Sequence, residues 1–250
     1  MAEPNDFDSP LRAFLEGIRP HLEELRRRLL VAVLALFVAT MLAFTVTGQV
    51  IEFLAQPVGG REGLQAIEMT ENLGVYMRTA LTLGAVLAMP VIVYEIVAFV
   101  APGLNPGEKR LLFTALPFIV LSFLAGVAFA YFVMLPVAIP FLLGFGDIPT
   151  TPRPRDYMSF ILRVMFWIGV AFETPLVIAL LARLGIVTPE RLQRSWRVAV
   201  VVIAVLAAMI TPTIDPVNML IVMGPLLLLY LLSILLARWT YRQRQTPAST

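Results

Sequence analysis

An acidic residue interrupts one of the most apolar stretches of the sequence. Residues 166–181 read FWIGVAFETPLVIALL, with Glu173 in the middle, followed by Thr174 and Pro175. A carboxylate near the centre of a bilayer is costly, and such residues usually face the interior of a helix bundle, a wet cavity or a partner. Pro175 lacks a backbone N–H and so leaves one helix carbonyl free. We therefore predict a polar site within the membrane at Glu173 and Thr174.

Three more carboxylates lie beside or inside apolar stretches. They are Glu24 in HLEELRRRLL, Glu95 in VIVYEIVAF and Glu108 in LNPGEKR. Each also has a structural explanation. Glu24 could pair with Arg28 one helical turn later. Glu95 could lie at the membrane interface, and Glu108 could complete a capping box with Asn105. From the residues alone, each of these acids could be either a binding residue or a purely structural one.

Several classes of chemistry find no support in the sequence. There is no Cys, which excludes disulfides and thiolate metal sites, and the single His argues against a histidine-based metal centre. We find no phosphate-binding loop and no arrangement of nucleophile and base. The sequence therefore predicts a protein that is not an enzyme, has no catalytic residues, and needs no metal, cofactor or nucleic acid.

The composition is that of an integral membrane protein. Of the 250 residues, 59% are hydrophobic and 14% are charged, whereas soluble domains average about 45 to 50% and about 25%. Several apolar runs approach or exceed the roughly 18 residues of a spanning helix. They lack the alternation of polar and apolar residues that marks membrane β-strands. We expect an all-α integral membrane protein with six transmembrane helices.

The expected spans form one membrane domain over residues 1–250. A segment of residues 1–28 precedes the membrane region of residues 29–237, and residues 238–250 form a tail. The fifth span is short, because its apolar run covers only about 20 Å of a hydrocarbon core about 30 Å thick. Pro20 is expected to interrupt an interfacial helix before the first span. The six spans are residues 29–47, 76–100, 111–135, 157–184, 198–209 and 217–237.

The basic residues predict how the chain is oriented. All but five of the 19 Lys and Arg residues flank one set of span ends. Short cytoplasmic loops carry the excess of positive charge, so this set, with both termini, is expected in the cytoplasm. An even number of spans also places both termini on the same side of the membrane. The five residues on the other, external side are Arg61, Arg78, Arg153, Arg155 and Arg163.

Several motifs together resemble one family, the TatC subunit of twin-arginine protein translocases. The motifs are HLEELRRRLL, AFVAPGLNPGEKR, GVAFAYFVMLP, FETP and MITPTIDPVN, and they cover nearly the whole chain in family order. Two positions depart from the family pattern, because Glu95 stands where many members carry Gln and Val97 stands where many carry Trp. These departures affect the expected local contacts more than the resemblance itself.

The resemblance implies a receptor in the cytoplasmic (inner) membrane. Members bind twin-arginine signal peptides and assemble with TatA- and TatB-type single-span subunits. The resulting oligomeric complex moves folded proteins across the membrane with the proton-motive force. By resemblance, Glu24 and Glu108 bind the arginine pair, Glu173 with Thr174 contacts a TatA-type helix, and Pro57 and Asp215 belong to the external loops. The other signal-peptide-binding residues expected from the resemblance are Arg26, Glu95, Phe99 and Pro102.

Two other functions, a transporter or channel and a membrane anchor, are alternatives to the receptor. A secondary transporter or proton channel would account for Glu173 and for the proline-interrupted helices. The sequence, however, has neither the internal repeats nor the paired broken helices of such transporters. A simple membrane anchor would need only one helix. Uptake of small solutes by vesicles would favour the transporter, whereas co-purification with a twin-arginine precursor would favour the receptor.

Overall fold

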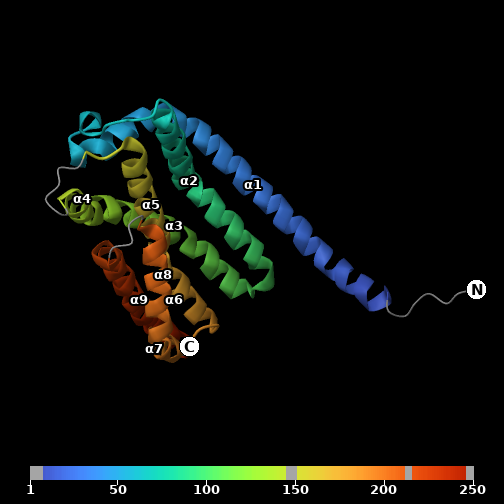
Figure 1. Cartoon of the computed structure of the whole chain (residues 1–250). Helices are drawn as coiled ribbons and strands as arrows, with labels where there is room; N and C mark the ends of the chain where they lie inside the picture. Colours follow the sequence, from blue (N-terminus) through green and yellow to red (C-terminus); the bar gives the residue numbers. More distant parts are fainter. Residues whose placement is uncertain (1–7, 145–150, 212–215, 246–250) are drawn as a thin grey trace, which may run out of the picture.

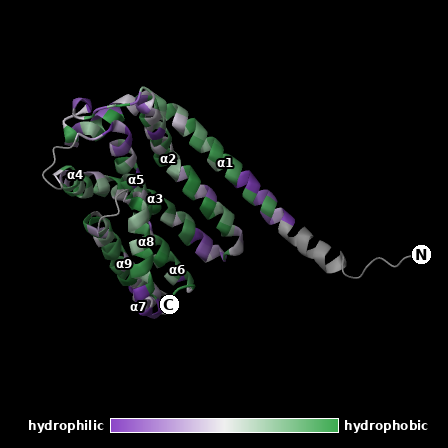
Figure 2. Cartoon of the chain, in the orientation of Figure 1, coloured by the Kyte–Doolittle hydropathy of each residue, from purple (hydrophilic) through white to green (hydrophobic). Residues whose placement is uncertain are grey.

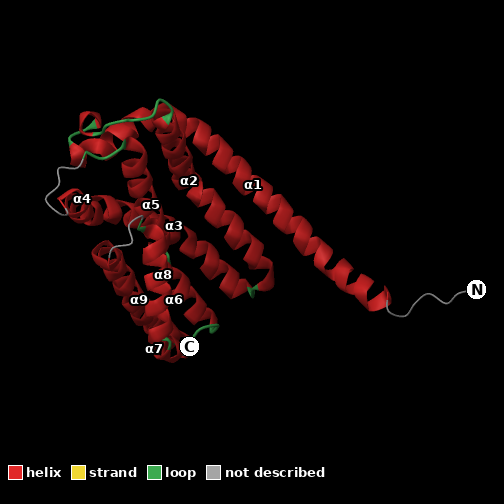
Figure 3. Ribbon diagram, in the orientation of Figure 1, coloured by secondary structure: helices red, strands yellow, loops and turns green. Residues whose placement is uncertain are grey.

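The structure is a computed structural model that describes residues 8–144, 151–211 and 216–245, and every regular element in these ranges is helical (Figures 1 and 3). Five helical stretches are long and apolar enough to cross a membrane, and a sixth apolar helix is shorter. Hydrophilic residues gather toward the helix ends, whereas the middles of the helices are apolar (Figure 2). The predicted all-α membrane fold is confirmed.

The two longest N-terminal helices form a hairpin. Helix α1 (Asp8–Ala55) packs along α2 (Glu71–Val100) (Figure 1). At their closest approach a Cβ on Gly84 would lie 2.7 Å from the Thr40 Cα, so only glycine fits there. Small residues of this kind let membrane helices pack backbone against backbone. The close contact fixes which residues of α1 face α2.

The predicted interruption at Pro20 is wrong, because α1 runs through it without a break. Proline removes one helix hydrogen bond and usually breaks a soluble helix. Pro20 lies before the predicted membrane region of residues 29–237, so the membrane environment does not explain the unbroken helix, and the structure shows that one missing N–H does not end α1 here. Prolines also lie inside other helices of this chain, as at Pro90, Pro117 and Pro225. The proline rule was therefore too strict for this kind of protein.

Short turns connect the helices at the two ends of the bundle. We call the end with η1 (Gln56–Val58) and η2 (Arg61–Gly63) the upper end, as it lies in Figure 1. The lower end contains η3 (Ala101–Gly103), which joins α2 to the next helix. The sequence predicts that the lower end is cytoplasmic.

The predicted third span, residues 111–135, continues in the structure well beyond Leu135. Helix α3 (Pro106–Phe129) leads through a π-helical turn, η4 (Ala130–Met134), into α4 (Leu135–Gly144). A π-helical turn fits an extra residue into the helix and often marks a functional region. Pro140 lies inside α4 without ending it.

The predicted fourth span consists of two helices. Helix α5 (Pro154–Phe172) ends at Glu173, and α6 (Thr174–Leu184) begins directly after it. The break follows from Pro175, whose missing N–H interrupts the helical ladder. Helices α3 and α5 pack so tightly that a Cβ on Gly126 would lie 2.9 Å from the Gly169 Cα. This contact holds the end of α5, next to the α5–α6 junction, close to α3.

The last part of the chain forms α7 (Pro189–Arg194), α8 (Trp196–Ile210) and α9 (Pro216–Gln245). Helix α8 covers only about 22 Å at 1.5 Å per residue, which is less than the hydrocarbon core of about 30 Å. The short fifth span is thus confirmed. A core of buried residues joins these helices to α1 and α5, with Leu54, Ile168 and Ala207 among its most buried members.

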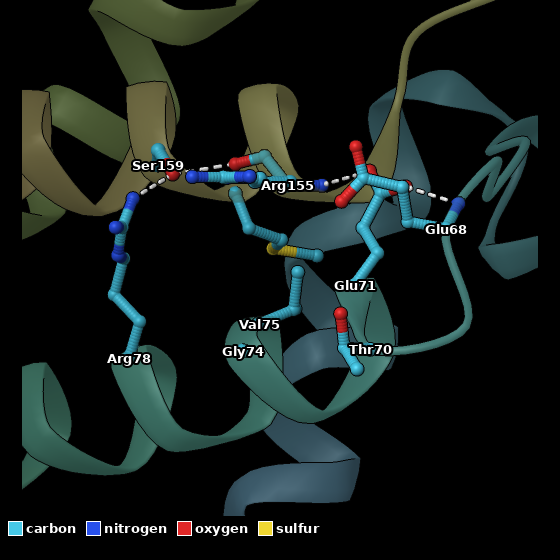
Figure 4. A pocket seen from close by; sticks show the side chains of 9 residues that line it. Glu68, Thr70, Glu71, Gly74, Val75, Arg78, Arg155 and Ser159 are labelled. Atoms are coloured by element: carbon cyan, nitrogen blue, oxygen red, sulfur yellow. Dashed lines mark hydrogen bonds between the residues drawn. The ribbon is translucent and has the colours of Figure 1, made fainter.

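At the upper end a buried carboxylate ties three segments together (Figure 4). Glu71 at the start of α2 is only 5% exposed. It accepts hydrogen bonds from the backbone N–H of Ile67 at 3.1 Å and of Arg155 at 3.0 Å. The backbone N–H of Gln65 also donates to the carbonyl of Pro152 at 3.2 Å. The loop before α2 is therefore fixed to the start of α5.

Candidate functional site

An arginine joins two of the predicted binding carboxylates near the lower end of the bundle. Arg28 Nη2 donates to Glu24 Oε1 at 2.6 Å within α1, and Arg28 Nη1 donates to Glu95 Oε2 at 3.1 Å on α2. Arg28 Nε also donates to Glu24 Oε1, at 3.0 Å. The two acids and the guanidinium therefore form one cluster, which we call the lower carboxylate cluster.

The local sequence and the packing of the hairpin explain this cluster. Glu24 and Arg28 are four residues apart, so they lie on one face of α1, as predicted. Glu95 is 67 residues further along than Arg28, and only the packing of α1 against α2 brings it into contact. Side-chain exposure is 34% for Glu24, 24% for Arg28 and 14% for Glu95. The cluster is shielded from solvent but still reachable.

Arg28 was not among the predicted site residues. Its pairing with Glu24 was predicted as an ordinary intrahelical contact, and that contact is present. Its contact with Glu95 had no signal in the sequence, because nothing there fixes the register of α1 against α2. Glu95 was expected to lie at the membrane interface, and its contact with Arg28 adds a specific cationic partner.

Glu108 lies at the start of α3, directly after the lower turn. Its Oε2 accepts a hydrogen bond from the backbone N–H of Asn105 at 3.1 Å, which completes the predicted capping box with Pro106 at the first helical position. The carboxylate is half-buried and makes no ion pair within the described residues. Glu108 and the lower carboxylate cluster lie near the same end of the bundle but are not in contact there.

The remaining residues predicted for signal-peptide binding also lie near this end. Phe99 is half-buried on the last turn of α2, one turn beyond Glu95, and Pro102 is exposed in η3. Arg26 is exposed on α1. Val97 is buried with Val93, Leu112 and Ile119, in a small core that fixes α2 against α3. This core positions the two helix ends that carry Glu95 and Glu108.

Glu173 stands at the junction of α5 and α6, within the membrane-spanning part of the bundle. Its backbone N–H donates to the carbonyl of Val170 at 3.1 Å. On α3, Ser122 donates its hydroxyl to the carbonyl of Phe172 at 2.7 Å, which satisfies a backbone group at the break. The side-chain atom Glu173 Oε1 is buried and has no hydrogen-bond partner among the described residues.

Thr174 points into a different environment from that of Glu173 Oε1. It is exposed and lines an apolar groove of about 540 Å³ between α5, α8 and α9. Trp167, Val202 and Tyr230 are among the other residues that line this groove, but Glu173 is not. Of the two residues predicted to form a polar site within the membrane, only Thr174 lines the groove beside the short helix α8, whereas Glu173, the residue before it, does not.

The two residues predicted for the external loops have different outcomes. Pro57 is exposed in the turn η1 at the upper end, and Gly59 follows it with a φ of 87°, the left-handed conformation that favours glycine. Asp215 lies outside the residues that the structure describes. Among the described residues there is no group of three or more His, Cys, Asp or Glu side chains that could hold a metal ion.

Known proteins match this chain along most of its length. Residues 20–225 match the family model of TatC, described as Sec-independent protein translocase protein. A TatC from Deinococcus radiodurans is 40% identical over 230 residues, which cover 87% of this chain and 84% of that protein. A TatC from Carboxydothermus hydrogenoformans is 35% identical over 235 residues, which cover 93% of this chain and 95% of that protein.

Solved structures agree with these matches. A crystal structure described as the twin arginine translocase receptor TatC superimposes with a TM-score of 0.79 at 35% identity. The match covers 88% of this chain and 99% of that one. Helix order, membrane character and sequence motifs thus lead to one conclusion: the chain belongs to the TatC family of Sec-independent protein translocase proteins.

Proposed function

We propose that this chain is the receptor subunit for twin-arginine signal peptides. The signal peptide would bind at the lower end, where Glu24, Glu95 and Glu108 gather. The observation that carries the proposal is that Glu24 and Glu95 already hold a guanidinium, that of Arg28, at 2.6 and 3.1 Å. A ligand arginine would meet the same acceptors.

The chemistry of the site favours arginine over lysine in the ligand. A guanidinium is planar and presents several donors in a fixed fork, so it can bridge two carboxylates that lie on different helices. An ammonium is a compact charge that cannot form the same parallel hydrogen bonds. Phe99 and Pro102 flank the acids and would contact the apolar residues next to the arginine pair. Arg26, exposed on the same segment of α1, would face anionic groups of the ligand or of the membrane.

The proposed topology places the lower end, with both termini, in the cytoplasm. It rests on the excess of basic residues at that end. Signal peptides of unexported precursors would then reach Glu24 and Glu108 directly. The upper turns, with Pro57 and the loop that holds Asp215, would lie on the external side of the cytoplasmic membrane. Residues 1–250 would act as one membrane domain.

We also propose that the break at Glu173 receives a partner subunit. An unpaired buried carboxylate in a membrane helix needs a polar group. The next residue, Thr174, lines a groove along the short α8 in which a partner helix could lie, and the Glu173 side chain would have to turn toward that groove to meet it. A TatA- or TatB-type single-span helix with a polar residue at that depth would supply the group. The assembled complex would move folded proteins with the proton-motive force.

A capture experiment tests the receptor role. The detergent-purified chain is immobilised and offered a folded precursor with a twin-arginine signal, and a second precursor in which both arginines are replaced by lysine. We expect at least roughly tenfold weaker capture of the lysine precursor, the loss of about one charge-assisted contact. Equal capture of the two precursors would contradict the proposal.

A further inference from the structure

A second groove lies along α5, nearer its start than the groove at Thr174. It has a volume of about 460 Å³ and is formed by α1, α2 and α5. Arg78 on α2 and Ser159 and Arg163 on α5 line its part nearer the upper end. Leu36, Ala85 and Phe166 line its part nearer the middle of the bundle. The groove is thus cationic toward one end and apolar toward the other.

The two arginines of this groove have no carboxylate partner among the described residues. The Arg78 side chain reaches from α2 across to α5 and donates a hydrogen bond to the Ser159 hydroxyl (Figure 4). Arg163 makes no hydrogen bond or ion pair with any described residue. No acidic residue lines the groove. The nearby acids are engaged, because Glu71 accepts backbone N–H groups and Glu68 lies 3.8 Å from Arg153.

The depth of the arginines fits the boundary between headgroups and hydrocarbon. Arg163 is nine residues past the start of α5, about 13 Å along the helix axis, in a helical stretch of 31 residues. That stretch is about 46 Å long, so a hydrocarbon core of about 30 Å centred on it would begin about 8 Å from its start and would place the Arg163 backbone about 5 Å inside the core. Side chains of a helix lean toward its N-terminus, which for both α2 and α5 is the upper end. Arg163 is therefore expected to lean toward the headgroups, whereas the Arg78 guanidinium reaches across to Ser159 on α5 (Figure 4).

We propose that this groove is a binding site for one phospholipid molecule. The lipid phosphate would lie between the guanidiniums of Arg78 and Arg163. The Ser159 hydroxyl orients Arg78 by accepting its hydrogen bond and donates its own proton to the carbonyl of Arg155. An acyl chain would follow the apolar floor past Leu36, Ala85 and Phe166. In the proposed topology the lipid belongs to the external leaflet.

A phospholipid matches the groove better than a partner helix does. It presents an anionic group and an apolar chain in the same order, from the membrane surface inward, as the groove presents arginines and apolar side chains. Phosphate oxygens also accept hydrogen bonds from more than one guanidinium at once. A partner helix would have to place an acidic residue at this depth to pair with the two arginines.

Lipid retention on the purified protein tests the proposal. Delipidated wild-type protein in detergent is titrated with dioleoylphosphatidylglycerol or with dioleoylglycerol, which has the same chains but no phosphate, and bound lipid is counted by native mass spectrometry. The test variant is Arg78→Gln with Arg163→Gln. The matched control is Arg61→Gln with Arg153→Gln, which removes the same charge at the same end outside the groove.

We expect the wild type and the control to bind one phosphatidylglycerol at least about tenfold more tightly than the test variant. Dioleoylglycerol should bind all three weakly. Equal retention by the test variant and the wild type would overturn the proposal, as would equal retention of the two lipids by the wild type. If the test variant fails to fold, Thr82→Trp fills the groove while keeping both arginines and should give the same loss.

A photocrosslinking residue at position 82 distinguishes lipid from protein as the occupant in native membranes. A crosslinked product with the mass of the chain plus one lipid supports the proposal. A product larger by the mass of a small membrane protein would show that a partner helix lies in the groove and would overturn it.

Discussion

The carboxylates of the lower cluster and the carboxylate at the α5–α6 junction are both near or within the membrane, yet they differ in their partners. Glu24 and Glu95 share the guanidinium of Arg28 and remain partly exposed. Glu173 Oε1 is buried and without a partner among the described residues. The first two acids are already satisfied and can exchange one cation for another. The third still needs a partner.

This difference separates two steps of the proposed function. Exchange of Arg28 for a ligand arginine costs little, because one charge-assisted contact replaces another of the same kind. Such a site suits reversible recognition of a signal peptide. An unpaired acid inside the bundle is destabilising until a polar group reaches it. Such a site suits assembly, because a partner that satisfies it stabilises the complex.

The largest effect is expected from removing the charge of two recognition carboxylates. Charge-assisted hydrogen bonds are worth about 1.5 to 3 kcal/mol each before solvent screening. Glu24→Gln with Glu108→Gln should therefore weaken precursor binding about a hundredfold, and Glu108→Gln alone about tenfold. Glu108→Gln keeps the capping box, because Gln also accepts from the backbone of Asn105.

Binding is measured by titration of a fluorescent precursor against the purified chain. Glu190→Gln, in the short helix α7 at the same end, is the control for loss of one negative charge. If the double variant lost affinity and thermal stability in proportion, the two acids would be structural residues only.

The next largest effect is expected at Glu173, where substitution should reduce transport but not precursor binding. Glu173→Ala removes both the shape and the hydrogen-bonding ability of the side chain, whereas Glu173→Gln keeps both. Transport of a precursor into membrane vesicles should fall roughly tenfold for Ala, about the worth of one buried polar contact, and much less for Gln. Precursor binding should stay unchanged in each. If Glu173→Ala transported as well as the wild type, or if it also lost precursor binding, the proposed role of Glu173 in assembly would be contradicted.

A smaller effect tests whether packing holds Glu173 in place. A Cβ on Gly126 would lie 2.8 Å from the Phe172 Cβ, one residue before Glu173. Gly126→Ala should therefore lower stability in detergent by about 1 to 3 kcal/mol, the usual cost of overpacking. Gly224→Ala is the control, because a Cβ there meets nothing within 4 Å. Equal melting temperatures for the two variants would mean that α3 and α5 can separate without cost.

Local features were predictable from the sequence, and contacts between distant helices were not. The capping box at Asn105 and the shortness of α8 follow from residues next to one another, and both are present. The carbonyl freed by Pro175 was also predicted, but the fourth span was predicted as one helix over residues 157–184, and the break at Glu173 was not. In each case the physical cause lies within one or two helical turns.

The contact between Arg28 and Glu95 has a cause of a different kind. It depends on the register of α1 against α2, which Gly84 and Thr40 set by their close approach. Single-sequence patterns do not show which small residues will meet. The same limit applies to the groove at Arg78 and Arg163, since these residues come from two helices whose separation in space only the fold defines. The error at Pro20 arose because one missing hydrogen bond does not end a long helix, as Pro90 and Pro117 also show.

The smallest expected effect sharpens the comparison most, because it tests whether Arg28 competes with the ligand. Arg28→Gln leaves Glu24 and Glu95 without their internal cation, so a signal arginine no longer has to displace it. Partly exposed ion pairs are weak, so the precursor should bind only about two- to fivefold more tightly. Arg27→Gln, which changes the exposed neighbour on α1, should leave affinity unchanged. Binding is measured over a range of salt concentrations, and the gain should shrink as salt screens the charges. If Arg28→Gln weakened binding instead, Arg28 would be the residue that positions the two acids for the ligand. The lower carboxylate cluster would then be a preorganised site and not an occupied one.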